Sequence, residues 1–340
     1  MSPVADRSVN PLARVRDAVW RPTPASLRLL ALLSVIANAG IIVTGGAVRL
    51  TKSGLGCPTW PQCTPDSMIP TSSPEHSAVN MAIEFGNRTL TFLVLASAAA
   101  VFVAAVRSVP RRRDLVRLAA VQPIGVLAQA GWGGVTVLTD LHPAVVASHF
   151  MLSPVLIIAA VALYVRSGEG DEPVRPLVGP RLRALALSLV PVAALLMVAG
   201  TIVTGTGPHA GDDRAERFGF DIAQVTRVHG ALAWITVALT VAVLIAVRRT
   251  DAPRALRRRV WDLVAIELAQ GAVGYVQYFT GVPALLVGLH MLGSALLWIA
   301  VLRVAFATRD RGPLAATPAP EPTTAASAEP AASQPAPHPA

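Results

Sequence analysis

The sequence predicts an all-α integral membrane protein with eight transmembrane helices, arranged as two four-helix bundles related by a pseudo-twofold axis. Of its 340 residues, 53% are hydrophobic and only 14% are charged, whereas an ordinary soluble domain carries about 25% charged residues. Eight separate apolar runs are each long enough to cross a bilayer, which takes about 20 residues. Landmarks of the first four runs recur in the last four, which predicts the two bundles.

The apolar runs are separated by short polar segments. We expect the helices over Ala25–Leu50, Val79–Val106, Leu115–Leu138, Pro143–Val165, Leu182–Thr204, Ile222–Val247, Val260–Phe279 and Pro283–Ala305. The expected units are a cytoplasmic arm (1–24), the first bundle (25–165), a cytoplasmic linker (166–181), the second bundle (182–308) and a tail (309–340). The tail is rich in Pro, Ala, Thr and Ser, a composition that cannot bury a core, so we expect it to be disordered.

The distribution of Lys and Arg predicts the orientation. Arginines gather in the N-terminal arm, in every second loop and after the last helix, and far outnumber the Lys and Arg of the opposite side. The positive-inside rule therefore places both termini in the cytoplasm. The same clustering between apolar runs argues against nucleic-acid binding, which the net charge of +9 would otherwise suggest. The polar start of the chain does not resemble a cleaved signal peptide.

The two halves share short motifs in the same order along the chain. The matching pairs are Leu127-Ala128-Gln129 with Leu268-Ala269-Gln270, Gly133 with Gly274, His149 with His290, and Val43-Thr44-Gly45 with Val203-Thr204-Gly205. Because each repeat holds an even number of helices, both halves have the same orientation, and the expected axis runs along the membrane normal.

Three histidines lie inside predicted helices: His149, His229 and His290. Each follows the outer entry of its helix by about seven residues, which is a depth of about 10 Å. Ionisable residues inside a membrane are costly and usually functional; the alternative is a packed histidine bonded to a neighbouring helix. The remaining histidines are interpreted as loop or helix-mouth residues without a ligand, and they are His76, His142, His209 and the tail residue His338.

Histidines at equal depth on neighbouring helices can share a ligand, and heme iron is the ligand that the pattern favours. Bis-imidazole iron requires two histidines on different helices of a bundle. Zinc is disfavoured because the second half offers no third or fourth ligand near that layer. The second half has the pair His229 and His290, whereas the first half has Asn87 and His149 at the corresponding positions.

A carboxylate and an arginine flank Asn87. Glu84, Asn87 and Arg88 follow the i, i+3, i+4 spacing of one helix face. Glu84 could act as a general base toward water or stabilise a cationic intermediate. The alternative is a plain buried ion pair between Glu84 and Arg88. Arg49, Arg88 and Arg227 are candidates for contacts with heme propionates.

The chain resembles the heme A synthase family in three places. Residues 45–63 read GGAVRLTKSGLGCPTWPQC, which resembles the family signature in its bacterial form with a cysteine pair. Residues 84–88 read EFGNR and are similar to the family's Glu-x-x-His-Arg. The intramembrane histidines of the second, third and fourth helix pairs match those of the family, so the resemblance covers all eight predicted helices.

The resemblance implies oxidation of the C8 methyl group of heme O to a formyl group, through an alcohol, with water as the oxygen source. It implies heme b on His229 and His290, and heme O as the substrate in the first half at His149. The sequence departs from the family at Asn87, where many members have His, so we do not expect bis-histidine ligation of the substrate. Implied partners are heme O and heme A, membrane lipid, heme O synthase, cytochrome oxidase subunits and an unidentified electron acceptor such as a quinone.

The two cysteines, Cys57 and Cys63, lie in the first outer loop, on a side where disulfides persist. Pro58 and Pro61 favour a turn between them, so we expect a disulfide; the alternative is two free thiols. Two other functions compete with heme oxidation. A di-heme b-type cytochrome that passes electrons from quinol shares the histidines but gives no reason for Glu84 or the loop motif. A transporter shares the repeats, but it predicts charged residues near the middle of the bilayer or interrupted helices, and neither stands out in the sequence.

Overall fold

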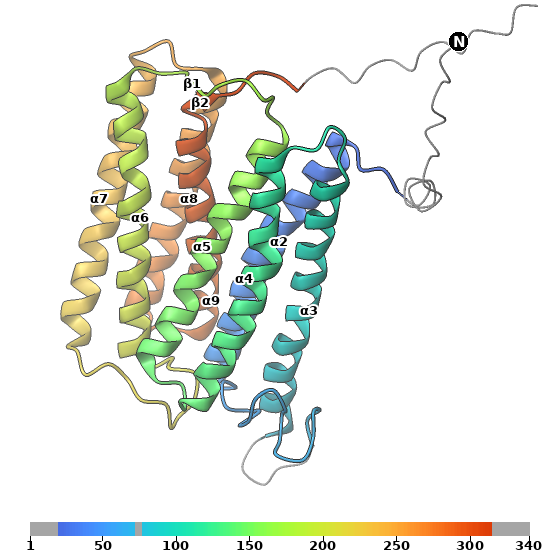
Figure 1. Cartoon of the computed structure of the whole chain (residues 1–340). Helices are drawn as coiled ribbons and strands as arrows, with labels where there is room; N and C mark the ends of the chain where they lie inside the picture. The colour runs from blue at the N-terminus through green and yellow to red at the C-terminus, as the bar shows by residue number, and fades with distance from the viewer. Residues whose placement is uncertain (1–19, 72–76, 315–340) are drawn as a thin grey trace, which may run out of the picture.

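The computed structural model describes residues 20–71 and 77–314, and within them the chain folds into eight helices and one pair of short strands (Figure 1). The elements are α2 (Pro24–Leu50), α3 (Ala78–Arg107), α4 (Arg113–Leu138), α5 (Pro143–Ser167), β1 (Arg175–Pro176), α6 (Pro180–Thr206), α7 (Ile222–Arg248), α8 (Arg254–Phe279), α9 (Ala284–Phe306) and β2 (Arg309–Asp310). Each expected apolar run is a helix. The arm and the tail lie mostly outside the described residues.

Six of the described helices are long and apolar enough to cross a membrane: α2, α3, α5, α6, α7 and α9. Helices α4 and α8 have 26 residues each but carry glutamines and, in α8, Glu267 within their apolar stretches. The structure therefore shows a helical protein with several membrane-crossing helices. The count of eight spans and the cytoplasmic position of the termini stay predictions.

The helices form two closed rings of four (Figure 1). In the first ring α2 packs on α3, α3 on α4, α4 on α5 and α5 on α2; in the second, α6 to α9 pack in the same order. The rings meet where α2 packs on α9, α5 on α9, and α5 on α6. Because α3 and α5, and likewise α7 and α9, stand diagonally across their rings, side chains of each diagonal pair can meet at the centre of a bundle.

Local signals explain where the helices begin. Thr23 and Ser26 form a capping box at the start of α2, with Pro24 in the first turn. The Ser77 hydroxyl accepts a hydrogen bond from the Asn80 backbone at the start of α3. Such side-chain caps satisfy backbone N–H groups that a helix start leaves free.

A polar cluster ties three helices of the first ring together. The side chain of Gln122 in α4 accepts hydrogen bonds from Ser34 (3.1 Å) and Asn38 (3.0 Å) of α2. Its amide nitrogen donates to the Leu156 carbonyl of α5 at 3.3 Å. All three polar side chains are buried. Polar side chains at helix contacts in membrane proteins commonly form hydrogen bonds between helices.

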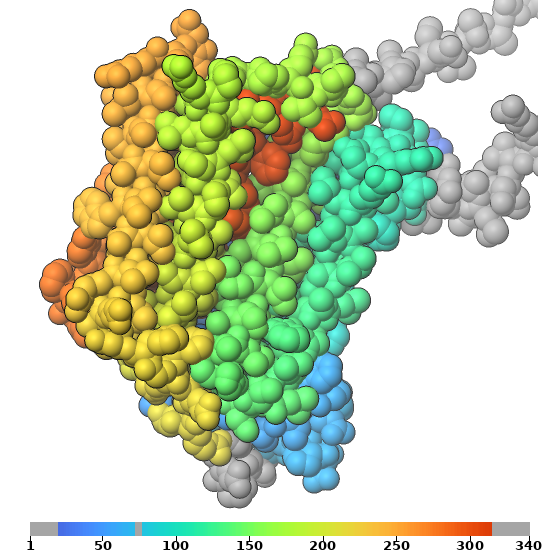
Figure 2. All heavy atoms as spheres, turned by 60° about the vertical axis from the view of Figure 1, so that its left-hand side comes forward, coloured from blue at the N-terminus to red at the C-terminus, as the bar shows by residue number. Residues whose placement is uncertain are grey.

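The Arg-rich end of the molecule carries the strand pair. β1, in the linker between the rings, pairs antiparallel with β2, which follows the last helix. In Figure 2 the last described residues (red) lie between the end of α5 and the start of α6. The chain segment after α9 thus fastens onto the linker that joins the two rings.

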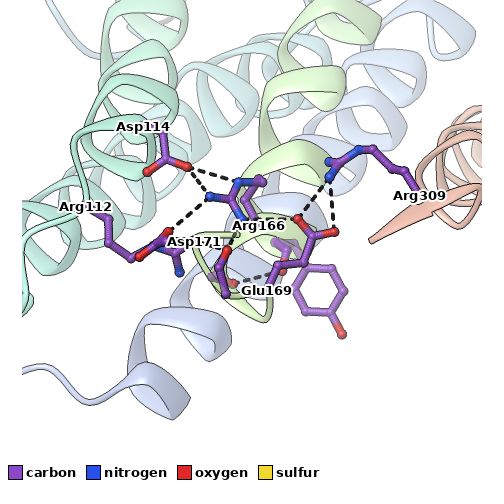
Figure 3. A network of polar contacts seen from close by, with 9 residues as sticks. Arg112, Asp114, Arg166, Glu169, Asp171 and Arg309 are labelled. Carbon is purple, nitrogen blue, oxygen red and sulfur yellow. Dashed lines mark hydrogen bonds and ion pairs between the residues drawn. The ribbon is translucent and has the colours of Figure 1, made fainter. Parts of the chain in front are cut away.

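A network of ion pairs surrounds this strand pair (Figure 3). At its centre Arg166, whose side chain is 7% exposed, pairs with Asp114 of α4 and with Glu169 and Asp171 of the linker. Arg309 of β2 also pairs with Glu169, at 3.2 Å. Burial alone would raise the pKa of Asp114, but the hydrogen bond and charge of Arg166 outweigh burial and lower that pKa. The network joins α4, α5, the linker and β2.

Candidate functional site

The structure brings His229 of α7 and His290 of α9 face to face across the second ring. Their ring centres are 6.2 Å apart and the ring planes are inclined by 71°. An iron midway between two imidazoles, with bonds of about 2.0 Å and ring radii of about 1.2 Å, places the ring centres about 6.4 Å apart. The spacing of this pair therefore matches axial ligation of one heme iron.

A glycine on a neighbouring helix supports each of these rings. A Cβ atom on Gly200 of α6 would lie 3.3 Å from Cε1 and 3.6 Å from Nδ1 of His229. On Gly274 of α8 it would lie 3.4 Å from Cε1 and 3.7 Å from Nδ1 of His290. Because the Nδ1 edges face the glycines, the Nε2 atoms are free to face a shared ligand.

The Nδ1 atoms of the pair, which point away from the space between the two imidazoles, are poorly paired. Among the described residues, Nδ1 of His290 is buried without a hydrogen-bond partner, and Nδ1 of His229 has only the Leu196 carbonyl nearby, outside hydrogen-bonding geometry. Buried polar atoms are usually paired. In addition, the buried residues of α7 and α8 are confined to the Arg-rich halves of these helices. The outer half of the ring is therefore open, which fits a heme between His229 and His290.

In the first ring, His149 of α5 lies against Gly133 of α4, at 3.3 Å from Cε1 and 3.7 Å from Nε2. Its Nδ1 is 3.0 Å from the side-chain amide of Gln129, which also contacts Ser153 at 2.8 Å. An amide can present either its oxygen or its nitrogen to an imidazole. With its nitrogen toward Nδ1, Gln129 donates to the imidazole and accepts from Ser153. The Cε1–Nε2 edge of His149 faces the glycine, so this imidazole is turned the other way from those of His229 and His290.

Asn87 of α3 contacts α2 and not His149. The hydroxyl of Thr44 donates a 2.8 Å hydrogen bond to Oδ1 of Asn87. Gly40, the counterpart of Gly200 in the repeat, has no atom within 4 Å of a Cβ built on it. The first four-helix ring thus has a glycine at the position equivalent to Gly200, but no imidazole lies against this glycine. A cavity of about 510 Å³ lies beside Asn87 and Thr44, between α2 and α3.

Glu84 and Arg88 hold the outer loop. The Glu84 carboxylate, 5% exposed, accepts hydrogen bonds from the Cys57 backbone N–H (2.6 Å) and from Arg88 (2.6 Å). The structure therefore contains the ion pair that the sequence offered as an alternative. It also confirms the expected disulfide between Cys57 and Cys63, which are both fully buried.

Arg88 uses all of its donors in this arrangement. Besides Glu84, its guanidinium donates to the carbonyls of Cys57 (2.8 Å), Thr59 (2.9 Å) and Gln62 (3.0 Å). A guanidinium has five N–H groups, and the five hydrogen bonds occupy them. A propionate contact by Arg88 would thus require one of these bonds to break.

The other two arginines lie differently. Arg49 reaches from the end of α2 to the second half, where its Nε donates to the His209 carbonyl. His209 in turn lies 2.9 Å from the Val282 carbonyl in the turn before α9. Arg227 is exposed, half a turn from His229 on α7. Propionate contacts by Arg49 and Arg227 stay predictions.

Two loop histidines fall outside the described residues: His76 and His338. His142 begins α5 and lines an outer cavity of about 480 Å³ together with Asp140, Arg214 and Glu216. Its position is consistent with the interpretation as a helix-mouth residue.

Sequence reasoning missed two features of the interior: the cluster around Gln122 and the pair formed by Glu267 of α8 and Thr240 of α7. A signal was present, since Gln122 and Glu267 interrupt otherwise apolar runs. Neither side chain belongs to a repeated motif, so the sequence gives no partner for it.

Comparison with known proteins identifies the family of this chain. The model of the cytochrome oxidase assembly protein family matches residues 28–302. A heme A synthase from Rhizorhabdus wittichii is 26% identical over 341 aligned positions, which cover 84% of this chain and 95% of the relative. A heme A synthase from Exiguobacterium sp. is 30% identical over 172 positions, covering 49% of this chain and 54% of the relative.

Proposed function

Because the chain belongs to the heme A synthase family of cytochrome oxidase assembly proteins, we propose that it oxidises the C8 methyl group of heme O to a formyl group. In the first step the methyl carbon gains the oxygen of water and loses two electrons and two protons, giving an alcohol. In the second step the alcohol loses two more electrons and two more protons, giving the aldehyde. The product, heme A, serves cytochrome oxidase in the plasma membrane of a bacterium, with heme O synthase and oxidase subunits as partners.

The pair of His229 and His290, with ring centres 6.2 Å apart, is the observation that carries the proposal. We assign heme b to this pair. Bound there, heme b supplies one-electron redox chemistry at its iron. His229 and His290 together would hold the iron, so neither imidazole would give way to a substrate there. The second ring therefore passes electrons from the substrate to an acceptor, for which we propose a membrane quinone.

The first ring suits a substrate that must enter and leave. His149 offers one imidazole, and Asn87 offers an amide that is bonded to Thr44 and is a poor iron ligand. An open depression of about 510 Å³ beside Asn87, lined by α2 and α3, provides space next to this amide. A single strong ligand lets heme O exchange more readily than two would.

Glu84 suits electrostatic stabilisation better than proton abstraction. Both of its oxygens are engaged, one by Arg88 and one by the Cys57 backbone. Abstracting a proton from water would break one of these hydrogen bonds. Stabilising positive charge that develops on the oxidised carbon requires no rearrangement, which is the advantage of a preorganised group.

Heme extraction from the purified protein, supplied with heme O, tests the proposal. We expect heme B with heme A or its alcohol precursor. Glu84→Ala should keep the low-spin heme b spectrum and stop the conversion, whereas His229→Ala should lose that spectrum. Glu172→Gln, which removes an exposed carboxylate, serves as the control. A protein that holds only heme B and never converts heme O would instead be an electron-transfer cytochrome.

A further inference from the structure

The second ring contains a carboxyl group that the proposed chemistry does not use. Glu267 lies half-buried in the middle of α8, and its Oε1 accepts a 2.7 Å hydrogen bond from the Thr240 hydroxyl of α7. No ion pair to Glu267 occurs within residues 20–71 and 77–314. Carboxyl groups among membrane helices are costly and commonly mark a proton or ion pathway.

Thr240 makes this contact at the expense of its own helix. A helical threonine usually returns its hydroxyl to a carbonyl of the preceding turn. Thr236, one turn earlier on α7, does so, donating to the Leu232 carbonyl at 2.8 Å. Thr240, which is fully buried, donates to Glu267 instead. The carboxyl group is therefore held in place between α7 and α8.

Glu267 lies on the face of α8 that supports the histidine pair. Glu267, Gln270 and Gly274 follow the i, i+3, i+7 spacing of one helix face. Gly274 touches the ring of His290, and Gln270 donates to the His290 carbonyl at 3.1 Å. Seven residues of helix span about 10 Å. Along α7, Thr240 lies eleven residues beyond His229, which spans about 16 Å. The carboxyl group thus lies two to three turns from the level of the proposed heme, along the same interior face.

Apolar side chains separate Glu267 from the Arg-rich end of the second ring. Toward the Arg-rich end, the buried side chains that follow on α7 and α8 are apolar: Val243, Val247, Leu256, Val260 and Leu263. Toward the histidine pair, neither helix has a buried residue. Proton exchange with Glu267 is therefore easier from the heme side than from the Arg-rich end.

Other charged groups around α8 make no contact with Glu267. The titratable and charged residues on the helices packed against it are Arg227, His229 and Arg248 of α7 and His290 and Arg303 of α9, and those of α8 are Arg254, Arg257, Arg258, Arg259, Asp262, Tyr275 and Tyr278. Asp262 pairs with Arg259. Among the described residues, Thr240 is the hydrogen-bond partner of the Glu267 side chain.

We propose that Glu267 is a redox-linked proton site, which binds a proton when the heme between His229 and His290 is reduced and releases it on reoxidation. The proposal rests on the proposed function, because it requires a heme at that pair. One electron entering the iron removes one positive charge from the centre of the ring. A carboxylate about 10–16 Å from the level of the iron, in a medium of low dielectric, loses a favourable Coulomb interaction and gains a proton.

The balance of the step follows from the substrate. Oxidation of the methyl group releases one proton for each electron, so a proton accompanies every electron that reaches the second ring. Glu267 gains an O–H bond as the electron arrives and loses it as the electron leaves for the quinone, which takes up both. Because no net charge builds up inside the bundle, a second electron can follow the first.

A redox titration of the heme b spectrum against pH tests this in the purified full-length protein. One proton bound per electron gives a slope of about 59 mV per pH unit for a one-electron couple. We expect the midpoint potential to fall with rising pH in the parent protein and in Glu267→Asp, and the slope to shrink in Glu267→Gln. The exposed-site control, Glu172→Gln, should keep the parent slope. Equal slopes in the parent and in Glu267→Gln overturn the proposal.

Infrared difference spectroscopy between the oxidised and reduced states decides the matter if Glu267→Gln binds no heme. A protonated carboxyl band should appear on reduction, and its frequency should shift in Thr240→Val, which keeps the carboxyl group but removes its hydrogen bond. An identical band, or none, in both proteins overturns the proposal. A parent protein without a bis-histidine b-type spectrum contradicts the proposed function instead, so the two failures are distinguishable.

Discussion

Replacing Arg88 with Met should destabilise the protein by unfastening the outer loop. Arg88 is the cationic partner of Glu84, whose side chain is 6% exposed, while the Arg88 side chain itself is 20% exposed. Removing one partner of a buried ion pair costs about 3–5 kcal/mol, and partial exposure of Arg88 favours the lower end. The three loop carbonyls also lose a donor, at about 1 kcal/mol for each that water does not reach. We expect a total of about 3–5 kcal/mol.

Denaturant unfolding in detergent measures this loss, with Arg117→Met as the control. Arg117 is exposed on α4, and such surface substitutions usually change stability by less than about 0.5 kcal/mol. The Cys57–Cys63 disulfide should also become easier to reduce in Arg88→Met. The double variant with Glu84→Gln should recover part of the loss, because it removes the unpaired charge. If the stability of Arg88→Met falls within about 1 kcal/mol of that of the control, and its disulfide is reduced as slowly as in the parent, Arg88 does not hold the outer loop.

Three further changes test other parts of the structure. Asn87→His places a ring over Gly40, so bound heme O should shift toward low spin and leave more slowly; an unchanged spectrum would contradict the open position. Gln122→Leu leaves its buried partners in α2 unpaired, so unfolding should show a loss of about 1–3 kcal/mol. Asp114→Asn should lower stability at neutral pH, and its deficit should vanish as the pH falls below the ordinary pKa of 3.8, because a lowered pKa stabilises the fold only while the carboxyl is ionised. A deficit that persists in acid would mean that the Asp114–Arg166 charge pair is not its source.

The sequence allowed the helices and the histidine pair to be predicted, because both depend on periodic or repeated features. Apolar length decides where a helix can cross a bilayer, and the equal distance of His229 and His290 from the outer ends of their helices predicted that they occupy one layer. The glycine under each ring was within reach of the same reasoning. Gly274 matches Gly133 in the repeat, yet a glycine in a membrane helix has many uses, so its contact with a ring is visible only in the structure.

The roles of individual polar side chains could not be predicted. The spacing of Glu84, Asn87 and Arg88 indicates one helix face, but the loop conformation decides that Arg88 binds three carbonyls. The sequence predicts for Arg166 only a contribution to the orientation of the helices in the membrane, whereas the structure buries its side chain among carboxylates. The loop carbonyls that bind Arg88 and the Asp114 carboxylate that binds Arg166 are distant in sequence from these arginines, so no local pattern predicts them.

The strand pair at the Arg-rich end bears on how the protein is made. Membrane helices enter the bilayer in the order of their synthesis. β1 can pair with β2 only after the last helix has been synthesised. Pairing of β1 with β2 is therefore a late event of biogenesis, which occurs only when the helices of both rings have been synthesised. A stop codon or a fusion partner placed directly after α9 would remove that final fastening while leaving every helix intact. Purification tags should be placed after Leu314, so that β2 remains free to pair with β1.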